Sequence, residues 1–166
     1  MRNFNKEQKR TSEKRNYTFV KTDGTNKDFV SMCAKLDQYL DELVGGNKQR
    51  SQYEQYNTVD KIQDVIVIYK DGIPIGSGAY RYYDDETAEL KRIYVDKPYR
   101  GIGLGKELVL SLEADARMKG FRYGILETGE LLETATHLYQ SIGYKVIPNY
   151  GPYVDMPESL CMQKKL

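Results

Sequence analysis

The sequence predicts a mixed α/β fold, with a mostly antiparallel central sheet of about six to seven strands and helices on both faces. Residues 64–96 contain three successive strand patterns separated by turn signals, and the second half of the chain alternates strand and helix patterns. The 166 residues, 40% of them hydrophobic, suffice for one core. We therefore expect a single domain over residues 15–166, after a polar and flexible leader over residues 1–14.

The first half of the domain begins with a strand and a long helix. Residues 15–22 alternate apolar and polar side chains, which predicts a strand. Residues 25–46 place apolar side chains at helical intervals, with Thr25 or Asn26 as the N-cap and two glycines as the stop. The polar residues 47–61 fit either a short helix or a mobile loop, and the two tyrosines within residues 47–57 are candidates for a wall of an acceptor pocket.

Strands and helices then alternate to the end of the chain. Within residues 64–96, an Asp-Gly pair at 71–72 predicts a hairpin turn, and the acidic cluster at 84–86 predicts the next one. Leucines at helical spacing then predict a helix that ends at Gly120. The remaining patterns predict a strand at 121–128, a helix at 131–143, and strands at 144–147 and 159–166.

Composition argues against several classes of protein. The 25 basic and 24 acidic residues leave a net charge of +1, whereas proteins that bind nucleic acid or membrane surfaces usually show a basic excess. The start lacks the apolar stretch of a signal peptide. Two distant cysteines, Cys33 and Cys161, indicate neither a disulfide framework nor a metal site. We expect a cytoplasmic protein with no metal, nucleic-acid or membrane partner.

Three glycines alternate between a predicted strand and a predicted helix, at positions 101, 103 and 105. Glycine lets the backbone approach a ligand closely, and the helix adds unpaired N–H groups and a positive dipole end. Such a corner suits a phosphate, to which Arg100 can add a fixed charge. The spacing fits neither a Walker loop nor a dinucleotide fingerprint, and by itself it also fits a plain turn.

The residues around these glycines resemble a known family. The stretch ELKRIYVDKPYRGIGLGKELVLSLEADARMKGF, residues 89–121, is similar to the central signature of the GNAT superfamily of N-acetyltransferases, a strand followed by R/Q-x-x-G-x-G/A. Arg100, Gly103 and Gly105 occupy its three fixed positions. The stretch ATHLYQSIGY, residues 135–144, resembles the second hallmark of the superfamily.

The resemblance implies acetyl-CoA as co-substrate and two central strands that splay apart around it. Its pyrophosphate would bind backbone N–H groups of the glycine loop, and its pantetheine arm would pair with the strand before the loop. The cofactor-binding residues implied are Ile93, Tyr94, Val95, Arg100, Gly101, Ile102, Gly103, Leu104, Gly105 and Lys106. Many members carry Asn or Gln where this chain has Leu132, which puts one polar cofactor contact in doubt.

The resemblance also suggests the catalytic groups. Glu89 lies where many members place a general base, although it also fits a strand-edge glutamate paired with Lys91 or Arg92. Tyr139 matches the tyrosine that commonly protonates the leaving thiolate, although a helical tyrosine is often only a core residue. His137 lies about 200° around the helix from Tyr139 and is expected to face away from the thiol.

The acceptor side is less defined. Glu127 and Thr128 end a predicted slot wall and are candidate acceptor contacts, although turns favour the same residue types. Tyr150 and Tyr153 lie in a proline-rich segment that can form a pocket wall. We expect direct acetyl transfer in a ternary complex to a small amine, an amino-acid-like compound or a peptide end, by a monomer or homodimer. The alternative is a non-catalytic acyl-CoA-binding or sensing domain of the same fold.

Overall fold

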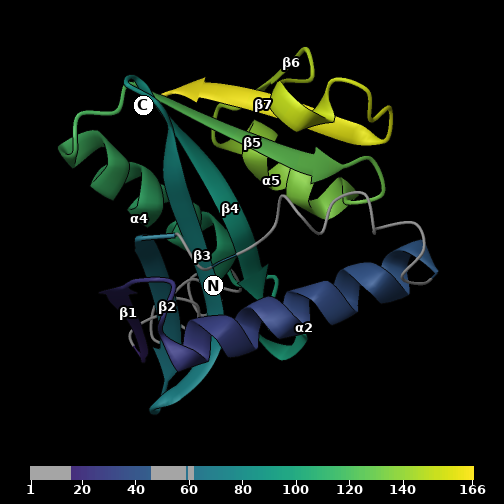
Figure 1. The fold of residues 1–166 in the computed structure, drawn as a ribbon. Coiled ribbons are helices and arrows are strands. Elements are labelled where there is room, and N and C mark those ends of the chain that lie inside the picture. Colours follow the sequence, from purple (N-terminus) through teal and green to yellow (C-terminus); the bar gives the residue numbers. More distant parts are fainter. Residues whose placement is uncertain (1–15, 46–58, 60–61) are drawn as a thin grey trace, which may run out of the picture.

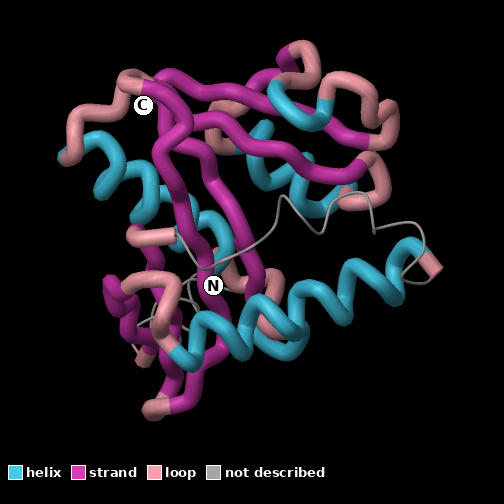
Figure 2. Tube along the Cα trace, viewed as in Figure 1, coloured by secondary structure: helices cyan, strands magenta, loops and turns pink. Residues whose placement is uncertain are grey.

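The computed structural model describes residues 16–45, 59 and 62–166. These residues form one seven-stranded sheet in the order β1-β2-β3-β4-β5-β7-β6 (Figures 1 and 2). The strands are β1 (Tyr17–Thr22), β2 (Asp64–Lys70), β3 (Ile73–Asp84), β4 (Thr87–Val95), β5 (Tyr123–Gly129), β6 (Lys145–Ile147) and β7 (Ser159–Lys165). The helices are α2 (Lys27–Val44), α4 (Leu104–Met118) and α5 (Glu133–Ser141), with 3-10 turns η2 (Lys97–Tyr99) and η3 (Gly151–Tyr153).

The predicted fold class is confirmed. All strand pairs are antiparallel except β4 with β5, and the order of strands and helices is the predicted one. The expected leader at 1–14 lies outside the described residues, as does the ambiguous segment at 47–61 apart from residue 59. In the part of the chain that the structure describes, no helix has the length and apolar character needed to cross a membrane.

Different helices cover the two faces of the sheet (Figure 1). On β2, Val65 and Val67 pack against α2, whereas Ile66 and Ile68 pack in the core built on α4. The strand is therefore buried on both faces, which explains its uninterrupted apolar run. Leu90 of β4 joins a third cluster, with residues of α4 and α5. One face thus belongs to α2 and the other to α4 and α5.

Local signals set the ends of α2 and of the first hairpin. The Asn26 side chain caps α2 by accepting hydrogen bonds from the N–H groups of Asp28 and Phe29, at 2.9 and 3.0 Å. Gly45 ends the helix in the left-handed region, at φ 80°. Asp71 and Gly72 both have positive φ, 51° and 78°, as the predicted two-residue hairpin turn requires.

The sheet opens between β4 and β5. The parallel pairing stops at Glu89 and Ile125, and the two strands then diverge (Figure 1). Three positions later, β4 also contains a β-bulge, because Arg92 and Ile93 lie opposite the single residue Gly78 of β3. Arg92 has a φ of 59°, and a Cβ at Gly78 would lie 2.6 Å from Ile93 Cδ1. A side chain at position 78 would therefore displace the end of the Ile93 side chain.

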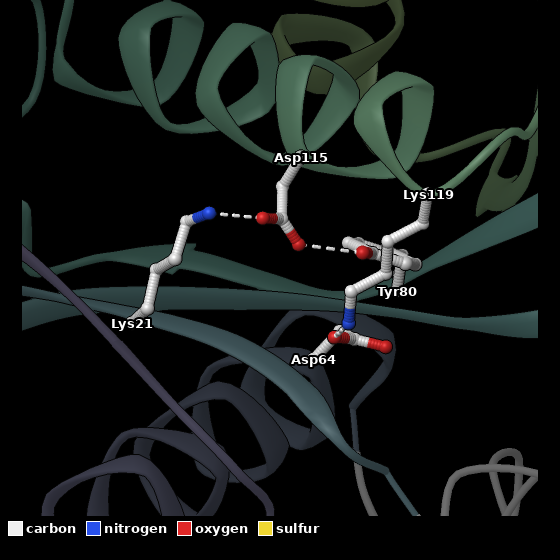
Figure 3. Close-up of polar contacts among 5 residues, drawn as sticks. All are labelled: Lys21, Asp64, Tyr80, Asp115 and Lys119. Atoms are coloured by element: carbon white, nitrogen blue, oxygen red, sulfur yellow. Dashed lines mark hydrogen bonds and ion pairs between the residues drawn. The ribbon is translucent and has the colours of Figure 1, made fainter.

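A cluster of hydrogen bonds and ion pairs connects α4 to the strands against which it packs. Figure 3 shows Asp115 of α4 between Lys21 and Tyr80, and Lys119 reaching Asp64 beside them. Tyr80 donates a 2.6 Å hydrogen bond to Asp115 Oδ2, and Lys21 forms an ion pair with the other carboxylate oxygen. These contacts join β1, β2 and β3 to the C-terminal half of α4, and so hold the helix that begins at the glycine loop.

Candidate active site

A cavity of about 1050 Å³ lies where the sheet opens. It is lined by both diverging strands, by the C-terminal half of α2, by the glycine loop before α4, and by the start of α5. Most residues predicted for the site line it: Ile93, Tyr94, Val95, Arg100, Gly101, Gly103, Leu104, Gly105, Lys106, Glu127, Thr128 and Tyr139. Glu89, Ile102, Tyr150 and Tyr153 do not, and Ile102 instead packs against the core under α4.

The glycine loop presents backbone rather than side chains to the cavity. Gly101 and Gly103 have φ values of 80° and 90°, a region that favours glycine. The first hydrogen bond of α4 runs from the Glu107 N–H to the Gly103 carbonyl at 3.1 Å, so the preceding N–H groups have no partner within the helix. No side chain caps this end of the helix. The loop therefore fits an anionic group such as a phosphate.

Arg100 is held in place beside this loop. Its Nε donates a 2.7 Å hydrogen bond to the Val95 carbonyl, and its guanidinium lies over the rings of Tyr39 and Tyr94, at 4.8 and 5.4 Å from their centres. The side chain remains largely exposed, and it lines the cavity. Its charge is therefore fixed next to the N–H groups that suit an anion.

Tyr139 closes the cavity from α5. The side chain is buried, and its ring packs edge-on against Tyr144 at a centroid distance of 5.8 Å. Burial, together with the nearby negative charge of Glu127, raises the pKa of Tyr139 far above its ordinary value. Tyr139 consequently keeps its proton at neutral pH and is a hydrogen-bond donor in the cavity. His137 is exposed on the other side of the helix, as expected.

Glu89 is not in the cavity wall. It is 1% exposed, its Oε1 accepts a 2.6 Å hydrogen bond from Arg81 Nε, and its Oε2 accepts one of 2.6 Å from the Tyr150 hydroxyl. The alternative to a general base was a glutamate paired with Lys91 or Arg92, and Glu89 does form an ion pair, with Arg81 directly opposite on β3. Glu89 is the last residue of β4 that pairs with β5, so it lies just before the opening.

Glu127 lines the cavity from β5, whereas Glu130, Glu133 and Glu158 line it from outside the strand. It lies on β5 two residues past Ile125, where the pairing with β4 ends. Burial raises the pKa of Glu127, although the hydrogen bond with Ser159 and the charge of Lys91 act in the opposite direction. A carboxylate of this kind is a stronger base than an exposed one. Thr128, the next residue, is buried and also lines the cavity.

Two buried cations on β4 were not predicted as site residues. Lys91 and Arg92 are each 8% exposed, and both line the cavity. Lys91 Nζ donates a 3.0 Å hydrogen bond to the Tyr153 hydroxyl, while Arg92 donates to Asp37 and to the Cys33 carbonyl of α2. The sequence did contain a signal for Lys91 and Arg92, because charged residues are rare inside a strand that is otherwise buried.

The predicted acceptor tyrosines lie behind the cavity wall. Tyr153 is fully buried, and its ring packs edge-on against Tyr150 at 5.6 Å. The Asn149 amide fixes the segment by donating to the carbonyls of Tyr153, Met156 and Ser159, each at 3.1 Å. Tyr150 thus holds Glu89 by a hydrogen bond, and Tyr153 holds Lys91 by another, each from the side away from the cavity.

Known proteins are similar to this chain in sequence and in fold. Residues 26–144 match the family model described as the acetyltransferase (GNAT) family. The chain is 30% identical over 153 residues to an IAA acetyltransferase of Azospirillum brasilense, an alignment that covers 91% of this chain and 99% of that protein.

Solved structures agree with the sequence comparison. A Klebsiella pneumoniae structure named as an acyl-CoA N-acyltransferase has 28% identity and a TM-score of 0.75, covering 90% of this chain and 97% of that one. A paiA N-acetyltransferase from Thermoplasma acidophilum, solved with coenzyme A, shares the fold at 19% identity and a TM-score of 0.69, over 90% of this chain and 99% of that one. With its splayed strands and glycine loop, this chain belongs to the GNAT family of acetyltransferases.

Proposed function

We propose that the protein is an N-acetyltransferase that moves the acetyl group of acetyl-CoA to a primary amine by direct transfer in a ternary complex. The observation that carries the proposal is that one cavity joins the glycine loop, the opening between β4 and β5, Glu127 and Tyr139. Membership of the family makes acetyl-CoA the co-substrate. A cytoplasmic location and a monomeric or homodimeric state remain predictions from the sequence.

The donor fits the part of the cavity between the glycine loop and β4. The N–H groups that precede the first helical bond of α4, with Arg100, suit the pyrophosphate. The β4 backbone beyond Glu89 no longer pairs with β5, so it suits the pantetheine arm as a strand-like partner. Bound in this way, the thioester lies in the same cavity as Glu127 and Tyr139.

Glu127, rather than Glu89, is the proposed general base. Both oxygens of Glu89 accept short hydrogen bonds and the residue lies outside the cavity wall, whereas Glu127 lines the cavity. The amine must lose a proton before its lone pair attacks the thioester carbon, and Glu127 accepts that proton directly or through a water. The pKa of Glu127 is raised toward neutral pH, and a general base is most effective when its pKa lies near the pH at which the enzyme works.

Tyr139 is the proposed partner of the leaving group. The C–N bond forms as the C–S bond breaks, and the departing thiolate needs a proton. Tyr139 stays protonated because burial and the Glu127 charge disfavour its phenolate, so its hydroxyl can donate to the sulfur. The products are an N-acetylated amine and the free thiol of CoA.

The first test is calorimetric titration of the purified protein with acetyl-CoA, followed by thiol release across a panel of amines. Micromolar binding with release on one class of amine supports the proposal. Binding with no release on any amine favours the alternative, a domain that binds acyl-CoA without catalysis. No binding contradicts both proposals.

A further inference from the structure

Among the charged residues that line the cavity, Lys91 on β4 and Glu127 on β5 lie on opposite sides of the opening. Their neighbours Leu90 and Leu126 both pack in the cluster formed with α4 and α5. Because side chains alternate along a strand, Lys91 and Glu127 point to the other face, where Lys91 contacts Tyr153 and Glu127 contacts Ser159. This is one face of the sheet with a cation on one diverging strand and a carboxylate on the other.

Other charged residues near this opening form ion pairs of their own. Arg81 pairs with Glu89, and Arg92 pairs with Asp37 at 2.9 Å. Burial raises the pKa of Glu127, and the charge of Lys91 opposes that rise, so the two side chains lie within electrostatic range of each other. An acceptor carrying only an ammonium would bring a second positive charge beside Lys91, at a cost in a buried site.

From this pair of charges we infer that the acceptor is a zwitterionic α-amino acid, whose carboxylate contacts Lys91 while its amine faces Glu127. The inference rests on the proposed function. Such an acceptor is neutral overall, so it leaves the cavity charge balanced. An ammonium has three donor hydrogens, so contacts with Tyr153 and with a carboxylate are compatible. Lys91 is then a specificity-determining residue, and Tyr153 positions it from behind.

The wall formed by α2 indicates the side chain of this amino acid. Leu36, Tyr39, Leu40, Leu43 and Val44 line the cavity at the spacing of one helical face. Leu131 and Leu132 line it from the segment before α5. An apolar or aromatic side chain gains from contact with these residues, whereas a charged one would lose its hydration there. We therefore expect acceptors such as leucine, methionine and phenylalanine.

The test compares each amino acid with the amine that lacks only its carboxylate: leucine with isoamylamine, methionine with 3-(methylthio)propylamine, and phenylalanine with phenethylamine. Steady-state thiol release gives kcat and KM for each. A contact with a charged group predicts that the wild type favours the amino acid by about 10- to 100-fold in kcat/KM. Lys91→Met should remove this preference by raising KM for the amino acid, and Lys91→Arg should restore part of it.

The matched control is Lys145→Met, which removes an exposed lysine of β6. It should leave all kinetic values within about two- to threefold of wild type. Turnover of the amines with no preference for the carboxylate, or a preference that survives Lys91→Met, overturns the inference but leaves the proposed function intact. Binding of acetyl-CoA with turnover only on amines outside these pairs also overturns it. Failure to bind acetyl-CoA removes the proposed function, and the inference with it.

Discussion

Arg81 lies directly opposite Glu89 in the register of β3 and β4, and its Nε is 2.6 Å from Glu89 Oε1. The Tyr150 hydroxyl donates a hydrogen bond to the second oxygen, Glu89 Oε2, also at 2.6 Å. Both oxygens of Glu89 are therefore engaged within the paired part of the sheet, which supports a structural role for it. Glu127, two residues past the end of the pairing, lines the cavity and is the proposed general base.

Glu127→Gln should therefore lower kcat/KM by about 100- to 10,000-fold, the range of a general base. In the wild type, kcat/KM should fall toward acid pH as Glu127 becomes protonated, at a pH above the ordinary carboxyl value because the pKa of Glu127 is raised. The variant should lack this acid limb. A pH profile of thiol release measures both effects.

Glu89→Gln is the matched comparison, because it also replaces a buried carboxylate by an amide. It leaves Arg81 without its anionic partner, so it should lower the melting temperature, while the acid limb of the pH profile persists. If Glu89→Gln removes the acid limb and Glu127→Gln retains it, the assignment of the base is reversed.

Tyr139→Phe should lower kcat by about 100-fold or more, with little change in the affinity for acetyl-CoA, because the hydroxyl acts on the departing sulfur. Tyr144→Phe is the control. Tyr144 is the buried ring next to Tyr139, and its hydroxyl has no hydrogen-bond partner among the described residues. The control should retain wild-type kcat. Equal kcat for wild type and Tyr139→Phe would remove Tyr139 from the mechanism.

Gly103→Ala should weaken acetyl-CoA binding by about 10- to 100-fold, because a residue that avoids positive φ turns the loop N–H groups away from the anion. Gly120→Ala is the control at the other end of α4. It has a similar φ of 96°, and its Cβ would contact nothing within 4 Å. Both variants should lose about 1–2 kcal/mol of stability. If calorimetry gives equal affinities for the two, the loop does not hold the donor.

The sequence predicted those elements whose signals are local. The N-cap at Asn26, the turn at 71–72 and the stop at Gly120 depend on a few neighbouring residues, and the structure has each of them. The opening of the sheet followed from the resemblance to a family, because no periodicity marks the point where two strands stop pairing.

The positions of the charged side chains of β4 relative to the cavity depend on where β4 and β5 stop pairing. Glu89 is adjacent to the opening in sequence, but it is still paired with β5, so it lies beneath the cavity. Lys91 and Arg92 point to the same face because a bulge interrupts the strand alternation. The bulge arises from contacts between strands, which a single sequence does not display.

Asp115→Asn should destabilise the protein at neutral pH by about 1–3 kcal/mol, the cost of weakening a partly buried charge-assisted pair. Burial acts to raise the pKa of Asp115, but the hydrogen bonds from Lys21 and Tyr80 outweigh it and hold the pKa below its ordinary value. A lowered pKa in the folded state gives stability above the pKa of the unfolded state, about 3.9. Denaturant unfolding should show the difference from wild type at pH 7 and its loss as the pH falls below about 4. A difference that persists at low pH would show that packing, not charge, is responsible.

Asn149 supports the acceptor side of the site through a single amide, which donates to the carbonyls of Tyr153, Met156 and Ser159. Asn149→Ala removes the donor, whereas Asn149→Asp replaces it by an acceptor that faces three other acceptors. Asp should therefore destabilise more than Ala at neutral pH, by about 1–3 kcal/mol. Because the carbonyls raise the pKa of the introduced carboxyl in the folded state, the excess loss should shrink as the pH falls and the group gains a proton. Thermal unfolding at neutral and acidic pH tests this order. Equal stabilities of the two variants at pH 7 would show that packing around residue 149, not donation by its amide, holds Tyr153 behind Lys91.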